Sequence, residues 1–126
     1  MEKYHGKGKT KISGTGGRIR KAADKKLHLA GSPFGATKIG EKEVRIVSRH
    51  RGNTHKIRLK VAAFANVLTK DGMKKVRIKN VTETPDNRHY ARQNLITKGA
   101  VIDSEIGKIK VTNRVGQDGV VNARLL

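Results

Sequence analysis

The chain has 126 residues, a formal net charge of +19 and a sequence pI of about 10.8. A positive excess of this size is typical of proteins that bind polyanions, and the absence of cysteine excludes disulfides and thiolate metal sites. The longest apolar run, residues 61–65, is far shorter than the roughly 20 residues of a membrane-spanning helix. There is no amphipathic membrane-binding pattern and no apolar signal region. We therefore expect a cytoplasmic protein that binds nucleic acid and not a membrane.

The first 30 residues form a basic, glycine-rich segment. They contain nine Lys or Arg against two acids, a net charge of +7, with five glycines among them. Because the segment has too few apolar residues to recover its ordering entropy by burial, we predict an N-terminal arm that is disordered until a polyanion orders it. Its candidate RNA-binding residues are Lys7, Lys9, Lys11, Arg18, Arg20, Lys21, Lys25 and Lys26.

A connector rich in glycine, residues 31–40, follows the arm. We therefore divide the chain into an extension with its connector, residues 1–40, and a body, residues 41–126. The body is basic as well, with 19 basic against 8 acidic side chains, a net charge of +11.

Within the body, apolar residues alternate with polar ones at the spacing of β-strands. Turn signals at Asp71-Gly72, Gly107 and Asp118-Gly119 separate several of these runs. The pattern predicts an all-β fold, a small β-barrel or sandwich of six to eight short strands, whose core consists of Val, Ile and Leu with Phe64 as its one large side chain. The expected strands lie at residues 44–47, 57–61, 64–68, 76–78, 100–104, 109–112 and 120–121.

One segment departs from the strand pattern. Thr84 is a candidate N-cap, and Pro85 suits the first position of a helix. This predicts one or two helical turns that expose Arg88, His89 and Arg92.

The sequence contains no recognised catalytic or metal-binding motif. Gly8-Lys9-Thr10 resembles the end of a phosphate-binding loop but lacks the earlier glycine of that motif. His50 and His55 lie among arginines, which would repel a metal ion. We expect no enzyme, no metal, no cofactor and no small-molecule substrate. Residues 14–18 are either a backbone nest for a phosphate or a flexible spacer.

The scarcity of aromatic residues, 3% of the chain, argues against recognition by base stacking. We therefore predict contacts with the phosphates and the shape of folded RNA. Besides the arm, the candidate RNA-binding residues are Arg49, Arg51, Asn53, His55, Lys56, Arg88, His89 and Arg92. A free RNA chaperone or translational regulator, and a DNA-compacting basic protein, are the alternatives to a component of a large RNA assembly.

Several blocks of the sequence resemble the archaeal and eukaryotic small-subunit ribosomal proteins of the S8e family. The longest are residues 87–92, 96–102 and 116–123, and residues 15–18, 33–40, 51–53 and 64–67 match as well. The resemblance implies a β-barrel body, a place in the small ribosomal subunit, direct binding to its ribosomal RNA and ribosomal proteins as neighbours. The compact length is similar to that of archaeal members.

Overall fold

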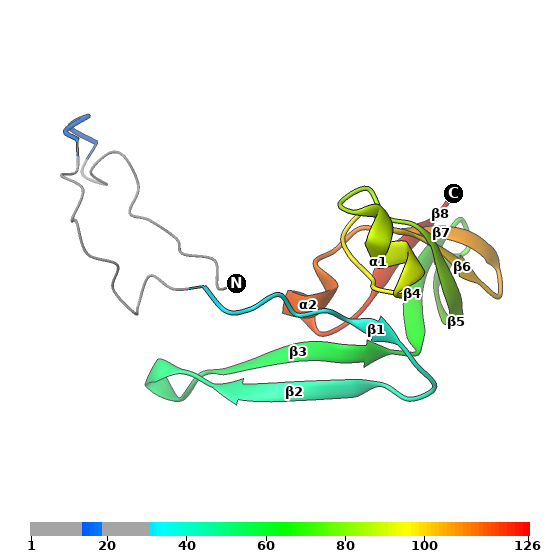
Figure 1. Cartoon of the computed structure of the whole chain (residues 1–126), viewed down its shortest axis with the longest axis horizontal. Helices are drawn as coiled ribbons and strands as arrows, with labels where there is room; N and C mark the ends of the chain where they lie inside the picture. The colour runs from blue at the N-terminus through cyan, green and yellow to red at the C-terminus, as the bar shows by residue number, and fades with distance from the viewer. Residues whose placement is uncertain (1–13, 19–30) are drawn as a thin grey trace. The chain divides into compact units, whose positions relative to one another are not determined.

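The computed structural model describes residues 14–18 and 31–126. The chain divides into two units, Met1–Phe34 and Gly35–Leu126, so the last residues of the predicted connector belong to the second unit. The prediction of disorder for the arm concerns residues that lie mostly outside the described ranges. In the second unit (Figure 1) the elements are β1 (Lys38–Ile39), β2 (Val44–Arg49), η2 (Arg51–Asn53), β3 (His55–Ala62), β4 (Phe64–Thr69), β5 (Gly72–Glu83), α1 (Arg88–Arg92), β6 (Val101–Ser104), β7 (Gly107–Val111), α2 (Val115–Asp118) and β8 (Asn122–Leu125).

The strands form a closed barrel and a separate small sheet. The barrel has the order β4-β5-β6-β7-β8, and it closes where β8 pairs with β4 in parallel. The small sheet has the order β1-β3-β2, in which β2 and β3 form a hairpin. The predicted fold class, a small β-barrel with six to eight strands, is confirmed. Only five of the eight strands, however, belong to the barrel.

Two of the predicted turns join antiparallel strands of the barrel. Asp71 lies between β4 and β5 and Gly72 begins β5, while Gly107 begins β7 directly after the turn from β6. Gly72 and Gly107 have φ angles of 124° and 120°, in a region that L residues with side chains avoid. The glycine signals in the sequence therefore reflect a real backbone requirement at both hairpins.

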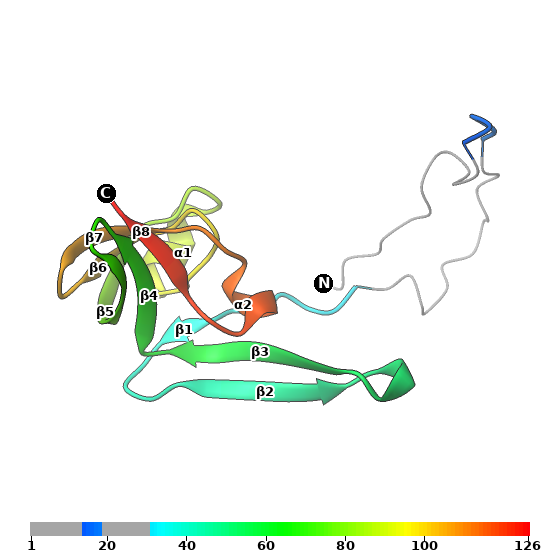
Figure 2. The same ribbon diagram turned by 180° about the vertical axis from the view of Figure 1, so that it is seen from behind.

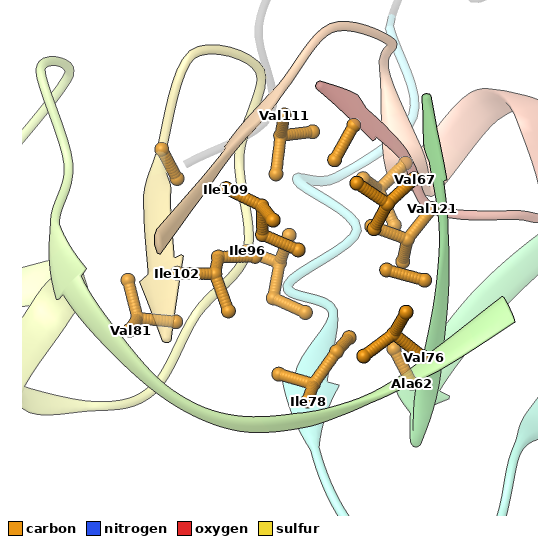
Figure 3. Close-up of a cluster of buried hydrophobic side chains, with 14 of the residues drawn as sticks. Ala62, Val67, Val76, Ile78, Val81, Ile96, Ile102, Ile109, Val111 and Val121 are labelled. Atoms are coloured by element: carbon orange, nitrogen blue, oxygen red, sulfur yellow. The ribbon is translucent and has the colours of Figure 1, made fainter. Parts of the chain in front are cut away.

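The interior of the barrel is filled by aliphatic side chains, as predicted. Ile102 and Ile109 are fully buried, and Figure 3 shows them among the other labelled side chains of the core. The prediction that Phe64 belongs to this core is wrong. Phe64 is half-buried and pairs with Arg77 across β4 and β5, while its neighbour Ala65 is buried. Because successive side chains of a strand point to opposite faces, Ala65 takes the inner position and Phe64 the outer one.

The helical predictions are partly corrected. A helix follows the Thr84-Pro85 segment as expected, but its N-cap is Asn87, whose Oδ1 accepts a hydrogen bond from the His89 N–H at 3.0 Å. Thr84 is buried and donates its hydroxyl to the Asn87 carbonyl at 2.6 Å. Its side chain therefore closes the turn before the helix and does not cap the helix itself.

The C-terminal part of the body also differs from the prediction. The short helix α2 was not predicted, because its four residues are too few to show a helical period and include Gly116. Gly119 ends α2 with a φ of 72°, and the last strand begins at Asn122, two residues after the start of the predicted run.

None of the helices in the described part of the chain is long and apolar enough to cross a bilayer.

Candidate nucleic-acid interface

The β2–β3 hairpin extends away from the barrel and carries the first group of predicted residues at its end (Figure 1). β3 runs from Ala62, which is part of the hydrophobic core, to the exposed His55. Leu59 is the core residue of β3 nearest to His55, so at about 3.3 Å per residue the four steps between them place His55 about 13 Å beyond the core along the strand.

The tip of the hairpin has a defined backbone. Residues 51–53 form a 3₁₀ turn in which Gly52 and Asn53 have φ angles of 70° and 58°. The N–H of His50 donates to the Thr54 carbonyl at 2.7 Å, and the Thr54 hydroxyl donates to the Arg51 carbonyl at 3.0 Å. These bonds close the loop, so the structure presents a compact group of exposed side chains. This group, the hairpin tip, consists of Arg49, Arg51, Asn53, His55 and Lys56.

The second predicted group lies on α1. Arg88, His89 and Arg92 are all exposed, while Ala91 packs against the hydrophobic core. Figures 1 and 2 show α1 beside the barrel and clearly separated from the hairpin tip. The structure therefore collects the predicted residues into two separate basic groups.

Of the predicted residues in the arm, only Arg18 is described, and it is exposed. Gly14 and Gly16, in the same short segment, have φ angles of 74° and 68°, which a phosphate nest requires. The nest remains a prediction. The other arm candidates, Lys7, Lys9, Lys11, Arg20, Lys21, Lys25 and Lys26, lie outside the described residues.

Acidic side chains neutralise few of the cations. Within the described residues, ion pairs form only between Arg45 and Glu43, at 2.9 Å, and between Lys74 and Asp71, at 3.4 Å. Neither pair involves the hairpin tip or α1. The cations of both groups are thus available to a polyanion.

Among the described residues, no acidic side chain joins His50 and His55 in a group that could bind a metal. No group of three potential metal ligands occurs in residues 14–18 and 31–126. The His50 ring nitrogen instead lies 3.0 Å from the Ser48 hydroxyl, as an ordinary hydrogen bond of the hairpin.

Seven further exposed or half-buried cations on the barrel strands were not among the predicted site residues. These are Lys74, Lys75, Arg77, Lys79, Lys108, Lys110 and Arg124. In the sequence they appear as basic residues that alternate with apolar ones on separate strands. Which of them are neighbours becomes visible only from the pairing of the strands, which also joins strands that are distant in the sequence, such as β4 and β8.

Together, the barrel, the protruding hairpin and the exposed cations define a basic β-barrel protein. Residues 6–126 match the family model of ribosomal protein S8e, and the chain therefore belongs to this family. It is a structural ribosomal protein and not an enzyme.

Three archaeal relatives support this assignment over most of the chain. The small ribosomal subunit protein eS8 of Sulfolobus acidocaldarius is 45% identical, over 100% of this chain and 98% of the relative. The eS8 proteins of Pyrobaculum calidifontis and Methanococcus maripaludis are 46% and 44% identical, over 90% and 89% of this chain and 86% and 89% of each relative. The resemblance read from the sequence is confirmed.

Proposed function

We propose that the chain is a constituent of the cytoplasmic small ribosomal subunit and binds the subunit's ribosomal RNA through the hairpin tip, α1 and the N-terminal arm. The observation that carries the proposal is the β2–β3 hairpin. It holds Arg49, Arg51 and Lys56 about 10 Å or more beyond Leu59, the nearest core residue of β3, with no ion pair to an acid of the described residues.

A two-stranded ribbon of this length is suited to reach between RNA helices. Each Lys or Arg that meets a phosphate releases condensed counterions, so binding gains free energy without any reading of bases. Arg49 and Arg51 also carry planar guanidinium groups, which form two parallel hydrogen bonds with phosphate oxygens. The hairpin tip therefore supports recognition of RNA by phosphate and shape.

α1 and the arm extend this mode of binding. Arg88 and Arg92 offer a second group of cations beside the barrel. The arm adds its net charge of +7, and its length, with the connector, allows a reach of about 130 Å when extended. A protein with these separate contacts fits a large folded RNA with ribosomal proteins as neighbours.

The salt dependence of RNA binding tests this proposal. For the full chain and a small-subunit ribosomal RNA transcript, we expect log affinity to fall with log salt at a slope of roughly −5 to −9. The triple variant Arg49→Gln, Arg51→Gln and Lys56→Gln should make the slope shallower by about 3, one unit for each lost phosphate contact. A control with the same loss of charge is the triple Gln variant of Lys42, Lys70 and Lys98, which are exposed and lie outside the predicted site.

A slope near −1 for the intact chain would contradict the phosphate-dominated mode. Equal slopes for the tip variant and its control would contradict the role of the hairpin. Two further measurements separate the alternatives. A free chaperone would leave small subunits during a moderate salt wash, and a DNA-compacting protein would prefer duplex DNA in direct competition with the ribosomal RNA.

A further inference from the structure

The two ends of the barrel are built differently. β1, α1, α2 and the β2–β3 hairpin are attached at the end where β4 and β8 begin and where β5 and β7 end. At the opposite end the strands are joined by two short turns, residues 70–71 and 105–106, and β8 reaches its last residue there. We call this opposite end the turn end. In Figure 2 the end of β8 and the β6–β7 turn lie on the side of the barrel away from α2 and the hairpin tip.

The turn end carries a cluster of exposed apolar side chains. Within the described residues, the large apolar side chains that are exposed fall mainly on the hairpin and at this end. Those at the turn end have exposed fractions between 41% and 65%, and they are Leu68, Met73, Ile106, Leu125 and Leu126. Single exposed apolar residues are ordinary, but a cluster of them at one end of a small protein marks an interaction site.

Met73 and Leu68 pair directly across β5 and β4. Val67, the residue before Leu68, is fully buried, so Leu68 and its partner Met73 point to the outside of the barrel. The Cβ atoms of a directly opposite pair lie about 5 Å apart. The two side chains therefore form one apolar surface.

β8 brings two leucines to the same place. Arg124 lies at the level of Leu68, on the strand next to β4, and Leu125 and Leu126 follow it. Leu125 pairs with the fully buried Ile109, so it lies on the inner side, at the mouth of the barrel. Because side chains alternate along a strand, Leu126 takes the outer side, about 7 Å along the strand from the level of Leu68.

The β6–β7 turn adds Ile106. This turn connects Ser104 with Gly107, which pair with each other. Two residues after Ile106, the Lys108 carbonyl accepts a hydrogen bond from the Leu126 N–H at 3.1 Å. A barrel of five strands is narrow, so a partner that sits over the turn end touches all five apolar side chains at once.

The charge at the turn end differs from that of the hairpin tip. Each of the two turns contains an acid, Asp71 and Glu105, whereas residues 49–56 contain none. Asp71 pairs with Lys74 at 3.4 Å, and Glu105 forms none of the ion pairs found in the described residues. An RNA backbone at this end would bring phosphates close to two carboxylates and would give the apolar side chains no apolar partner. RNA is therefore a poor match for the turn end.

We propose that the turn end is the docking site of a neighbouring protein of the small subunit, which covers the five apolar side chains with an aliphatic surface of its own. This inference rests on the proposed function and extends it. A second copy of this chain is a poor match, because each copy carries a net charge of +19. The exposed Lys70, Lys108 and Arg124 flank the apolar side chains, so the partner is expected to carry acidic residues at the rim of its surface.

The location of this site separates the two kinds of contact. The hairpin and α1, which carry the proposed RNA-binding residues, are attached at one end of the barrel, and the apolar side chains lie at the other. The barrel therefore connects ribosomal RNA at one end to a protein at the other.

Site-specific photocrosslinking tests the proposal, because the chain has no cysteine and a single introduced one can carry a benzophenone. Met73→Cys labels the turn end and His50→Cys labels the hairpin tip, while Lys98→Cys, at an exposed position away from both, is the control. Each full-length protein is assembled into small subunits with the ribosomal RNA and the other small-subunit proteins of Sulfolobus acidocaldarius. After irradiation, mass spectrometry identifies the crosslinked peptides and nucleotides.

We expect the label at position 73 to crosslink to one protein, at a segment that contains aliphatic and acidic residues, and the label at position 50 to crosslink to RNA. Crosslinks from position 73 to RNA, to a second copy of this chain or to no molecule would overturn the docking site. So would crosslinks from position 98 to the same protein segment. All of these results leave the proposed function intact when position 50 reaches RNA, and a failure of position 50 to reach RNA would count against the proposed function itself.

A pair of variants supplies a second measurement. Leu68→Gln with Met73→Gln keeps the size of both side chains but removes the apolar surface. In competition with the unchanged protein for assembly into small subunits, this variant should lose by about tenfold or more. Its affinity for the ribosomal RNA transcript alone should stay the same.

The matched control is Leu68→Met with Met73→Leu, which keeps the surface apolar and should compete as well as the unchanged protein. Equal competition by the Gln variant and this control would contradict the docking site. A loss by the Gln variant that already appears with RNA alone would contradict it as well, because the effect would then not require a protein partner.

Discussion

Gly119 is one of the residues at which the protruding hairpin meets the body, and its replacement by alanine tests how the hairpin is held. It ends α2 with a φ of 72°, and its carbonyl accepts a hydrogen bond from Arg45 Nε of β2 at 3.2 Å. A Cβ at this position would lie 3.1 Å from Ile57 Cγ2 and 3.6 Å from Ile57 Cβ, both on β3. Gly119→Ala therefore adds a methyl group directly between α2 and the hairpin.

Two costs add up in this variant. The left-handed backbone costs a residue with a Cβ about 1–2 kcal/mol, and a crowded methyl group typically costs about 1–3 kcal/mol more. Gly52→Ala is the matched control, since Gly52 has a φ of 70° but no atom within 4 Å of the added Cβ. We expect Gly119→Ala to lower the free energy of unfolding by at least about 1 kcal/mol more than Gly52→Ala does.

Urea denaturation of the full chain measures both losses, and Ile57→Ala completes a double-mutant cycle. Ile57→Ala removes the Cγ2 atom that the new methyl group would meet, so part of the loss in Gly119→Ala should disappear in the double variant. Equal losses for the two glycine variants would refute the reasoning. So would a double variant whose loss is the sum of the two single ones, because either result would mean that the hairpin is not seated at Gly119.

Two other predictions concern the body and the arm. Thr37→Val should cost about 1–3 kcal/mol of stability, because the fully buried Thr37 hydroxyl donates to the Leu59 carbonyl at 2.7 Å. Thr97→Val should be neutral or stabilising by comparison, because the buried Thr97 hydroxyl has no hydrogen-bond partner in the structure; urea denaturation of both variants checks the difference. Deletion of residues 1–30 should leave the β circular dichroism of the body unchanged and sharply weaken RNA binding at moderate salt, and unchanged binding would contradict the role of the arm.

The sequence predicts the parts of the fold that depend on local pattern. Alternation of apolar and polar residues marks the strands of the barrel, and Gly72 and Gly107 mark its turns because both need a positive φ. The parallel pairing of β8 with β4, which closes the barrel, has no local signal, since it joins residues 56 positions apart such as Asn66 and Asn122. For the same reason the separation of β2 and β3 from the barrel was not predicted.

The candidate RNA-binding residues could be predicted from the sequence only where they are contiguous along the chain. The hairpin tip is one contiguous stretch, so its basic residues are visible as a group in the sequence and the structure keeps them together. The cations of the barrel are spread over β5, β7 and β8, and the sequence does not show which of them are neighbours. On a single strand, Lys108 and Lys110 look like ordinary residues of a solvated face. Only the register of β7 with β8 shows that Lys110 lies beside Arg124.

The distribution of charge in the body explains how so basic a protein keeps its fold. Within the described residues, the buried polar side chains are all neutral, namely Thr37, Thr84, Thr97 and Ser104. No charge has to be desolvated in the core, so the stability of the barrel comes from its aliphatic side chains and is largely independent of the partner.

The hairpin is the part of the body that a partner most needs to support. Beyond α2 it is a two-stranded ribbon, which is marginally stable in water by itself, and it exposes the paired Val47 and Ile57 to 60% and 48%. The close approach of Ile57 to Gly119 and the hydrogen bond from Arg45 to the Gly119 carbonyl fix the base of the hairpin. Nothing in the described body covers its outer half. RNA bound at the tip would therefore stabilise the element that presents it, which couples binding to the order of the hairpin and leaves the barrel unchanged.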